Sequence, residues 1–303
     1  MATINRASTV KELVPGLNAI FGMEYNRYEQ EWVPLYQGDS SDRAFEEDVL
    51  FSGFGAAPVK NEGSPVVFDS AAEGYVSRYQ HETIALAFAI TEEAMEDNLY
   101  DKLSSRLTKA LARSMVHTKE VKGADTFNNG FSSSFLGGDG DPLFSTSHAL
   151  EDGGSESNRP ATDVDISETA LEDAMIQIAG WVDDRGIPLA TQARRLLIPR
   201  QLVFITQRLL ATELRPDTAN NDINALRSMG MIPDGFSINH RLTDIDAWFM
   251  LTDVPDGLKY FTRVPMQTRM EGDFDTGNVR YKARERYSFG WSDFRGAWGT
   301  TGA

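Results

Sequence analysis

The chain has 303 residues, long enough to bury a sizeable core without disulfides or structural metals. Its 29 Lys and Arg residues against 45 Asp and Glu residues give a formal charge of −16, which argues against a general nucleic-acid-binding protein. The absence of cysteine excludes disulfides, thiolate metal sites and thiol nucleophiles. No apolar run approaches the ~20 residues of a membrane span, so we expect a soluble protein with no membrane partner.

The first 90 residues combine aromatic side chains with turn-forming residues. Residues 1–45 predict an N-terminal arm that carries a short helix near Val10 to Phe21. Residues 46–90 consist of short apolar or alternating runs separated by Gly and Pro, which is typical of a long, turn-rich β-hairpin. Lys60 and Glu62 lie at its predicted tip.

A long amphipathic helix, which we call the spine helix, is predicted over residues 91–123. Thr91 is a suitable N-cap, the first turn is acidic, and Gly123 follows the last basic residues. An apolar residue recurs every four positions, and 33 residues of helix would span ~50 Å. The residues of this apolar stripe are Met95, Leu99, Leu103, Leu107, Leu111 and Met115.

The middle of the chain changes from a polar loop to a region of mixed helices and strands. Residues 124–162 are rich in Gly, Ser, Asn and Asp, whereas residues 163–265 contain helical periodicity at Ser167 to Asp184 and several short strand patterns. Residues 141–186 carry eleven acidic and two basic side chains, a local net charge of 2 − 11 = −9. Basic residues elsewhere could therefore find acidic partners in the same chain or in a second copy.

Residues 279–295 predict a strand with two unlike faces. Apolar and aromatic side chains occupy one parity, and cations occupy the other, which period-two alternation places on opposite sides. We expect the cations to form an outward row made up of Arg280, Lys282, Arg284 and Arg286. Both a contact with a neighbouring copy and a solvated face paired within the chain fit this pattern.

Motifs for catalysis or cofactor binding are weak. The Gly53–Pro58 stretch does not complete a dinucleotide-binding loop, and the histidines lack zinc-site spacing. Asp273 and Asp275 begin like a calcium loop, but Arg284 stands where the bidentate acid should fall. We therefore expect no catalytic, metal-binding or cofactor-binding residues.

Several sequence segments, and the order in which they follow one another, resemble the major capsid protein of tailed bacteriophages with the HK97-type fold, in particular the Mu-like major head subunit group. They span nearly the whole chain: GFGAAPVKNEG, AITEEAMEDNLYD, LFSTSHALEDGG, RLLIPRQL, NHRLTDIDAWFML and RYKARERYSFGWSDFRG. The resemblance implies an α+β fold with an N-terminal arm (1–45), an extended β loop (46–90), a peripheral domain (91–162 and 266–303) and an axial domain (163–265). The peripheral domain would hold the spine helix and the return strand 279–295.

The resemblance also implies a structural role in place of an enzymatic one. The chain would self-assemble into pentamers and hexamers of an icosahedral head that encloses double-stranded DNA without sequence-specific binding. It would be made in the cytoplasm of a bacterial host and end in the virion, with scaffolding, portal and decoration proteins as possible partners. The alternatives are an encapsulin-like non-viral shell and, from another class, a soluble hydrolase.

The resemblance suggests six assembly-interface residues: Lys60, Glu62, Arg280, Lys282, Arg284 and Arg286. Some members of this fold join subunits through an isopeptide bond from a loop lysine. Attack by Lys60 would need a desolvated, neutral amine, whereas the sequence around it is polar and rich in Gly and Pro. We therefore expect a solvated or salt-bridged Lys60.

Overall fold

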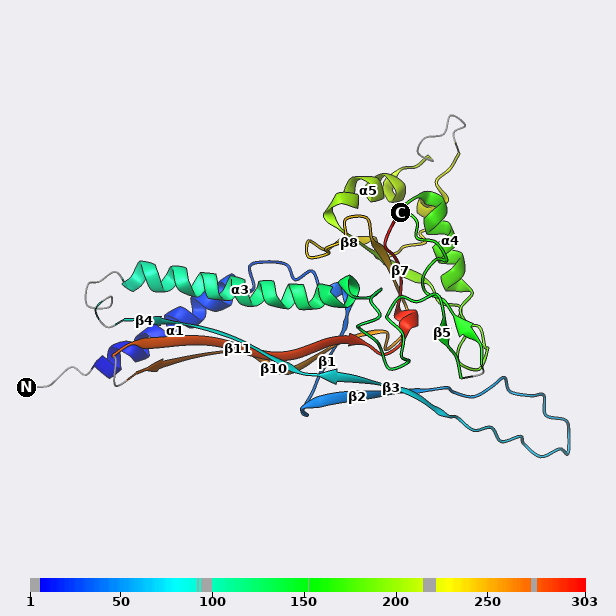
Figure 1. Cartoon of the computed structure of the whole chain (residues 1–303), viewed down its shortest axis with the longest axis horizontal. Helices are drawn as coiled ribbons and strands as arrows, with labels where there is room; N and C mark the ends of the chain where they lie inside the picture. The colour runs from blue at the N-terminus through cyan, green and yellow to red at the C-terminus, as the bar shows by residue number, and fades with distance from the viewer. Residues whose placement is uncertain (1–5, 92, 94–99, 152, 215–221, 274–276) are drawn as a thin grey trace, which may run out of the picture.

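The computed structural model describes residues 6–91, 93, 100–151, 153–214, 222–273 and 277–303, with side chains from Pro15 onward apart from those of 100–103. An elongated body, a smaller body at one of its ends and a protruding hairpin give the molecule three limbs (Figure 1). Within these described ranges, every helix is too short or too polar to cross a membrane.

The elongated body is built on a four-stranded sheet. Its order is β1 (Gln37–Ser40), β10 (Leu258–Gly272), β11 (Val279–Trp291) and β4 (Glu82–Ile90). β11 lies in the middle and pairs antiparallel with both β10 and β4, while β1 adds to β10 in parallel. The strand predicted from the alternation at 279–295 is therefore a central strand that ends at Trp291.

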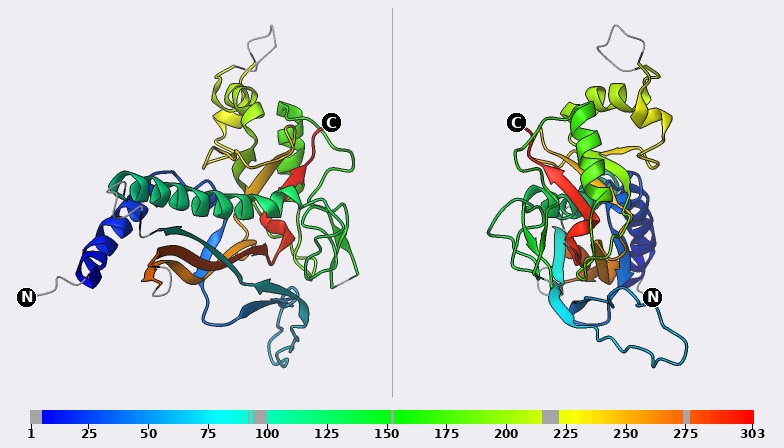
Figure 2. Two further views of the ribbon diagram at one scale, coloured as in Figure 1. Left: turned by 60° about the vertical axis from the view of Figure 1, so that its left-hand side comes forward. Right: turned by 90° about the vertical axis from the view of Figure 1, so that its right-hand side faces the viewer.

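Two helices, α1 (Arg6–Tyr25) and α3 (Tyr100–Asn128), cover one face of this sheet, and the hairpin limb lies on its other side (Figures 1 and 2). The 29 residues of α3 span about 44 Å. A buried cluster joins the two helices to β11 through Leu17, Phe21, Leu111, Ala112, Met115, Tyr281 and Ala283. The N-terminal arm thus contributes a helix to the core of the elongated body.

The spine helix ends later than the sequence predicts. α3 continues through Gly123 to Asn128, because this glycine serves close packing and does not end the helix. A Cβ added at Gly123 would lie 2.7 Å from the Cβ of Trp32. Most of the predicted first turn, including Met95 and Leu99, lies outside the described residues, as does the Leu103 side chain.

The smaller body contains a second sheet of order β12 (Ala297–Thr300), β9 (Trp248–Thr252), β7 (Ala193–Ile198) and β8 (Phe236–Ile238). Three helices accompany it: α4 (Glu168–Ala179), α5 (Val203–Ala211) and α6 (Ala225–Ser228). Its core includes three buried tryptophans, Trp181, Trp248 and Trp298. Since β12 pairs with β9, the chain's last strand belongs to this sheet, and the domain boundaries drawn from the sequence stay a prediction.

The hairpin consists of β2 (Phe45–Phe51) and β3 (Glu73–Gln80), joined by residues 52–72, which contain no strand. β4 follows β3 after a single residue, so the base of the hairpin continues into the large sheet. Short elements complete the fold: the 3-10 helices η1 (Val33–Leu35), η2 (Arg200–Leu202) and η3 (Phe294–Gly296), and the strands β5 (His148–Ala149) and β6 (Ser155–Glu156).

Candidate functional site

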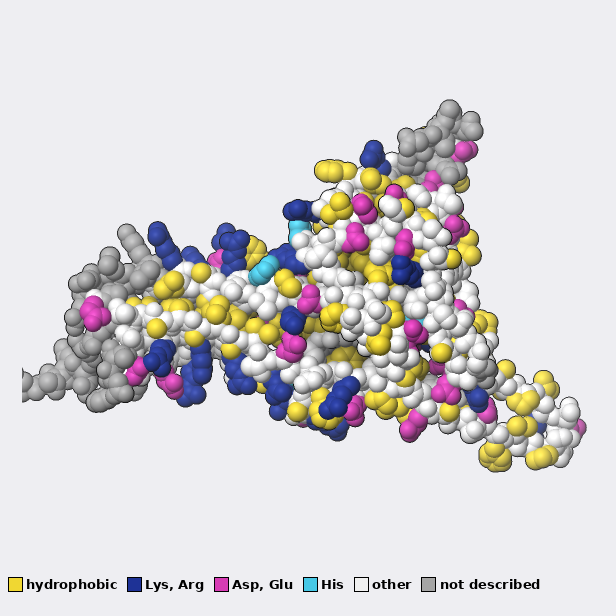
Figure 3. All heavy atoms as spheres, viewed as in Figure 1, with side chains coloured by type: hydrophobic (Ala, Val, Ile, Leu, Met, Phe, Trp, Pro, Cys, Tyr) yellow, Lys and Arg dark blue, Asp and Glu magenta, His cyan; other side chains and the backbone are white. Residues whose placement is uncertain are grey.

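The alternation predicted for β11 is confirmed over its first half. Tyr281 and Ala283 are buried under the helices, whereas Arg280, Lys282 and Arg284 are exposed on the opposite side. We use the name cationic face for Arg280, Lys282, Arg284 and Arg286, of which the last is half-buried. Figure 3 shows Lys and Arg side chains in a row along the lower edge of the elongated body.

The strands beside β11 decide what surrounds the cationic face. On β10, Glu271, Arg269 and Gln267 lie opposite Arg280, Lys282 and Arg284. On β4, the corresponding partners are all alanines: Ala89, Ala87 and Ala85. The cations are therefore flanked by mixed polar side chains on one side and by small side chains on the other.

Few of these cations are neutralised by the chain itself. Arg280 forms an ion pair with Asp273. Lys282, Arg284 and Arg286 have no ion pair with any residue that the structure describes, and the Nε atom of Arg286 is buried without a hydrogen-bond partner. Burial first, and then the nearby Arg286, lower the pKa of His81. Of the four cations, Arg280 is therefore the one that has an ion-pair partner among the described residues of its own chain.

Glu285 breaks the pattern and was missed from the sequence. Its side chain points to the helices, where it is 2% exposed and forms an ion pair of 3.3 Å with Lys119 of α3. Tyr25 of α1 donates a hydrogen bond of 3.2 Å to the same carboxylate. Burial raises the pKa of Glu285, while Lys119 opposes that shift. This buried pair ties both helices to β11, and its only sequence signal is an acid between two cations.

Lys60 and Glu62 belong to the loop 52–72, and this loop lies at the far end of the hairpin from the sheet (Figure 1). Both side chains are exposed, and neither has an ion pair within the described ranges. The structure does not bring them near the cationic face, which lies along the elongated body. The interface role of all six residues stays a prediction.

The loop exposes an unusual amount of apolar surface. Its exposed apolar side chains are Phe54 (62%), Val59 (91%), Val66 (63%), Val67 (67%) and Phe68 (94%). One contact holds the loop to the smaller body, because Arg185 donates hydrogen bonds of 3.1 Å to the Asp69 carboxylate and to the Ser70 carbonyl. The other Asp69 oxygen accepts from the Gly55 amide at 2.8 Å, which closes the loop on itself.

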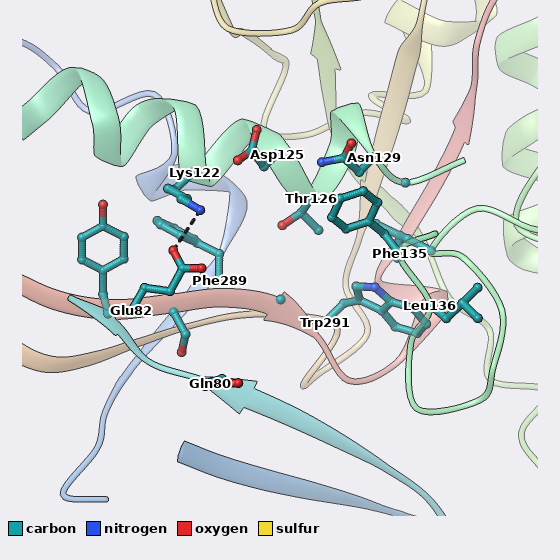
Figure 4. Close-up of a pocket in the computed structure, with 15 residues that line it drawn as sticks. Gln80, Glu82, Lys122, Asp125, Thr126, Asn129, Phe135, Leu136, Phe289 and Trp291 are labelled. Atoms are coloured by element: carbon teal, nitrogen blue, oxygen red, sulfur yellow. Dashed lines mark ion pairs between the residues drawn. The ribbon is translucent and has the colours of Figure 1, made fainter. Parts of the chain in front are cut away.

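A hollow of about 460 Å³ lies where α3, β11 and the loop after α3 meet (Figure 4). Lys122 and Glu82 form an ion pair of 2.8 Å across one side of it. Phe135 and Leu136 are more than half exposed at the other side, beside Trp291. Burial raises the pKa of Asp125 on the α3 wall. The hollow therefore offers an apolar floor with a charged rim and holds no arrangement of nucleophile and base.

In the described part of the chain, one set of acidic and histidine side chains is close enough to hold a metal: Asp139, Asp141 and His148. Both ring nitrogens of His148 are already engaged, Nδ1 with Asp139 at 2.6 Å and Nε2 with the side-chain oxygen Oδ1 of Asn158 at 3.2 Å. The ring also stacks on Phe294 at 3.9 Å. These contacts give His148 a packing role in holding the loop to the C-terminal segment.

The fold defines the class of protein. A long helix over a sheet, a protruding hairpin and a second sheet body make up the α+β HK97-type fold of shell-forming subunits. Three solved structures match over at least 91% of each chain. They are a capsid of a native GTA particle (11% identity, TM-score 0.56, 91% of each chain), a structure from Mycobacterium phage Adephagia (11%, 0.54, 91% of each), and a virus-like particle from Pyrococcus furiosus (10%, 0.51, 94% of this chain and 97% of that chain).

The sequence itself identifies the family. Residues 74–299 match the family described as phage capsid protein, so the chain belongs to it. A search of curated proteins gave no match. The expectation of a major capsid protein that forms the homo-oligomeric shell of an icosahedral phage head is confirmed, and the protein is a virion component. The family match favours this reading over a non-viral shell and over a hydrolase.

Proposed function

We propose that the chain forms pentamers and hexamers that close around double-stranded DNA, with no catalytic turnover. The observation that carries this proposal is the loop 52–72, whose apolar side chains are 62–94% exposed. An isolated soluble protein rarely leaves such side chains gathered in one segment, and a segment of this kind marks a protein–protein contact. A neighbouring subunit is the partner that a self-assembling shell supplies.

The cationic face supports the same proposal. Three of its four cations have no ion pair in the described part of the chain, although the chain as a whole carries a charge of −16. Acidic groups of adjacent copies are therefore abundant. Charge pairs across a repeated interface fix register and orientation more than they add affinity. The overall acidity also suits a container for DNA, because it weakens attachment of phosphate groups to the wall.

The finer assignments rest on the resemblance noted in the sequence. The peripheral domain comprises 91–162 and 266–303, the axial domain 163–265, and the extended loop 46–90. The Mu-like subgroup, synthesis in the host cytoplasm, and contacts with scaffolding, portal and decoration proteins belong to the same proposal.

Sedimentation and electron microscopy of the purified protein test the proposal. Rings or closed particles of tens to hundreds of subunits are expected, since each subunit presents several interaction surfaces. A small fixed oligomer with hydrolase activity against ester or peptide substrates would contradict it. Particles that package a cargo protein in place of DNA would favour the encapsulin-like alternative.

Lys60 offers a second test of a purely non-covalent shell. Its side chain is exposed to water, whereas a lysine that attacks an amide must be desolvated. Mature particles boiled in denaturant should therefore run as one band at the monomer mass of 33.6 kDa. A ladder of multimers that disappears in Lys60→Ala would show a crosslink and contradict this expectation.

A further inference from the structure

β4 is an edge strand to which the described residues give none of the usual protection. The strand order places it at the open side of the large sheet, and nine consecutive residues pair with β11 without a bulge. Thr83–Ile90 reads TIALAFAI, with no charge, proline or glycine. Leu86 is 47% exposed and Thr83, Ala85, Ala87 and Ala89 are also exposed. Natural proteins shield edges of this kind with charges, bulges, prolines or a covering element, because the free amide and carbonyl groups invite another strand.

The small side chains on β4 give the edge a second property. A strand added beyond β4 would lie two strand spacings, about 9.6 Å, from β11, with Ala85, Ala87 and Ala89 between it and Arg284, Lys282 and Arg280. Extended Arg and Lys side chains cover most of this distance, a carboxylate side chain on the added strand covers the rest, and the alanines do not obstruct them. The cations of β11 can therefore reach a side chain on a strand added beyond β4.

This arrangement selects the kind of strand that can be added. If β4 paired with β4 of a second copy, two rows of cations would lie on one face of a continuous sheet, and like charges brought together oppose association. An extended segment with carboxylates at alternate positions would place them within reach of the cations, since both have the period-two spacing of a strand. The edge therefore favours an acidic partner.

We infer that the β4 edge and the cationic face together bind an extended, acidic segment of a second copy of this chain. This inference rests on the proposed shell function, which puts many copies at each subunit's surface. The chain supplies the required chemistry, because 45 of its residues are acidic and residues 141–186 alone carry a net charge of −9. The main-chain groups of β4 give affinity, and the cations give the choice of partner and its register.

Ala87→Glu tests the inference. The new carboxylate lies directly opposite Lys282, so it satisfies that cation within the chain and repels the acidic segment of the neighbour. We expect the melting temperature of the subunit to stay unchanged or rise, and the yield of particles to fall about tenfold or more. Ala87→Gln is the matched control, because it has the same size without the charge, and it should assemble nearly as well as the unaltered chain.

The outcomes separate the inference from the proposed function. Assembly of Ala87→Glu at the level of Ala87→Gln would overturn the inference while leaving the shell function intact. Failure of the unaltered chain to form particles would count against the shell function itself.

A crosslinking experiment identifies the occupant. The chain has no cysteine, so Ala89→Cys can be labelled at one position with a benzophenone maleimide and then assembled into particles made of this chain alone. Irradiation should join pairs of subunits, and peptide mapping should place the second attachment point in an acidic segment of another copy. Attachment to residues 82–90 of the other copy, or no joined pairs in intact particles, would overturn the inference.

Discussion

At the residue scale, Glu120 is the most unusual ionisable group of the elongated body. It is 2% exposed, its Oε1 atom accepts a hydrogen bond of 3.0 Å from the Glu31 amide, and its Oε2 atom is buried without a partner. Burial, followed by the charge of Glu31, raises its pKa to about 7, while Arg241 opposes the shift. Around it, a groove of about 760 Å³ is also lined by Lys109, Arg113, His117, Glu24 and Glu29.

Glu120 should make the subunit less stable as pH rises. A carboxyl group whose folded pKa lies above its unfolded value stabilises the fold fully below that unfolded value of about 4.5, and the contribution is lost as pH rises through about 7. Compared with Glu120→Gln, which does not titrate there and keeps the Oε1 acceptor, the unaltered chain should lose of the order of 2 kcal/mol between pH 5 and pH 8. Denaturant unfolding of both proteins across this range measures the difference. Parallel pH profiles would show that Glu120 titrates normally.

Gly123 gives a second prediction at this scale. Helix propensity alone predicts that alanine inside α3 stabilises the protein by about 1 kcal/mol. The Cβ of alanine would instead meet the Cβ of Trp32 at 2.7 Å, and neither atom can rotate away. Gly123→Ala should therefore destabilise the subunit by about 1–2 kcal/mol in denaturant unfolding.

The control for this substitution is Gly16→Ala in α1, where no described atom lies within 4 Å of an added Cβ. Propensity should act without opposition there, and the variant should be as stable as the unaltered chain or more so. If both variants stabilised the protein equally, the close packing of Trp32 on α3 would be wrong.

At the scale of elements, β11 combines a core face with a cationic face on which Lys282, Arg284 and Arg286 have no ion pair among the described residues. Reversing the two exposed cations Lys282 and Arg284 to Glu should reduce particle yield far more than subunit stability, because exposed charges within one chain are worth only ~0.2–1 kcal/mol each. In a shell, the effect of the same change is repeated at every interface. Thermal melting and particle yield measured on one preparation distinguish the two effects. Equal losses in both would indicate that these cations act within their own subunit.

The sequence predicted those features of the elements that depend on local spacing. The alternation of β11, the core residues Leu111 and Met115 of α3, and the hairpin without a core at its tip all follow from periodicity and turn residues. The outward direction of the cations follows for the same reason. The fold itself could not be predicted from periodicity; it was expected because several sequence segments resemble those of a known family.

The features that the sequence did not predict depend on contacts between distant parts of the chain. Gly123 suggests a helix end until Trp32, 91 positions away, is packed against it. Glu285 becomes a core residue only because Lys119 and Tyr25 meet it. The open edge of β4 depends on strand order, which no local pattern contains. For the same reason, the sequence predicted which cations face outward, but it could not predict that alanines of β4 lie between these cations and the edge of the sheet.

At the scale of the whole molecule, the hairpin and the two bodies place the interaction surfaces far apart. The loop 52–72 extends beyond the smaller body, while the cationic face lies along the other limb (Figure 1). A subunit of this shape can contact several neighbours at once, which a closed shell requires. The contact of Arg185 with Asp69 and Ser70 is the hydrogen-bonded link that the described structure shows between the loop 52–72 and the smaller body.

Removal of residues 53–69 should separate folding from assembly. This segment contributes little to any core, so the helical circular dichroism and the melting temperature of the subunit should change only slightly. Particle formation should be abolished, because the loop's apolar side chains would no longer reach a neighbour. In the unaltered chain, amide hydrogen exchange in residues 53–69 should be fast in free subunits and slow in particles. Normal particles from the shortened chain would show that the loop has no part in assembly.

The central claim is that this chain alone encodes the repeating unit of an icosahedral shell. Cryo-electron microscopy of particles formed by the purified, unaltered protein tests it most directly. We predict closed particles whose map accommodates the subunit in rings of five and six, with the loop 52–72 and the β4 edge both in contact with neighbouring copies. A map with open sheets or a small oligomer, or with both surfaces facing solvent, would contradict the account.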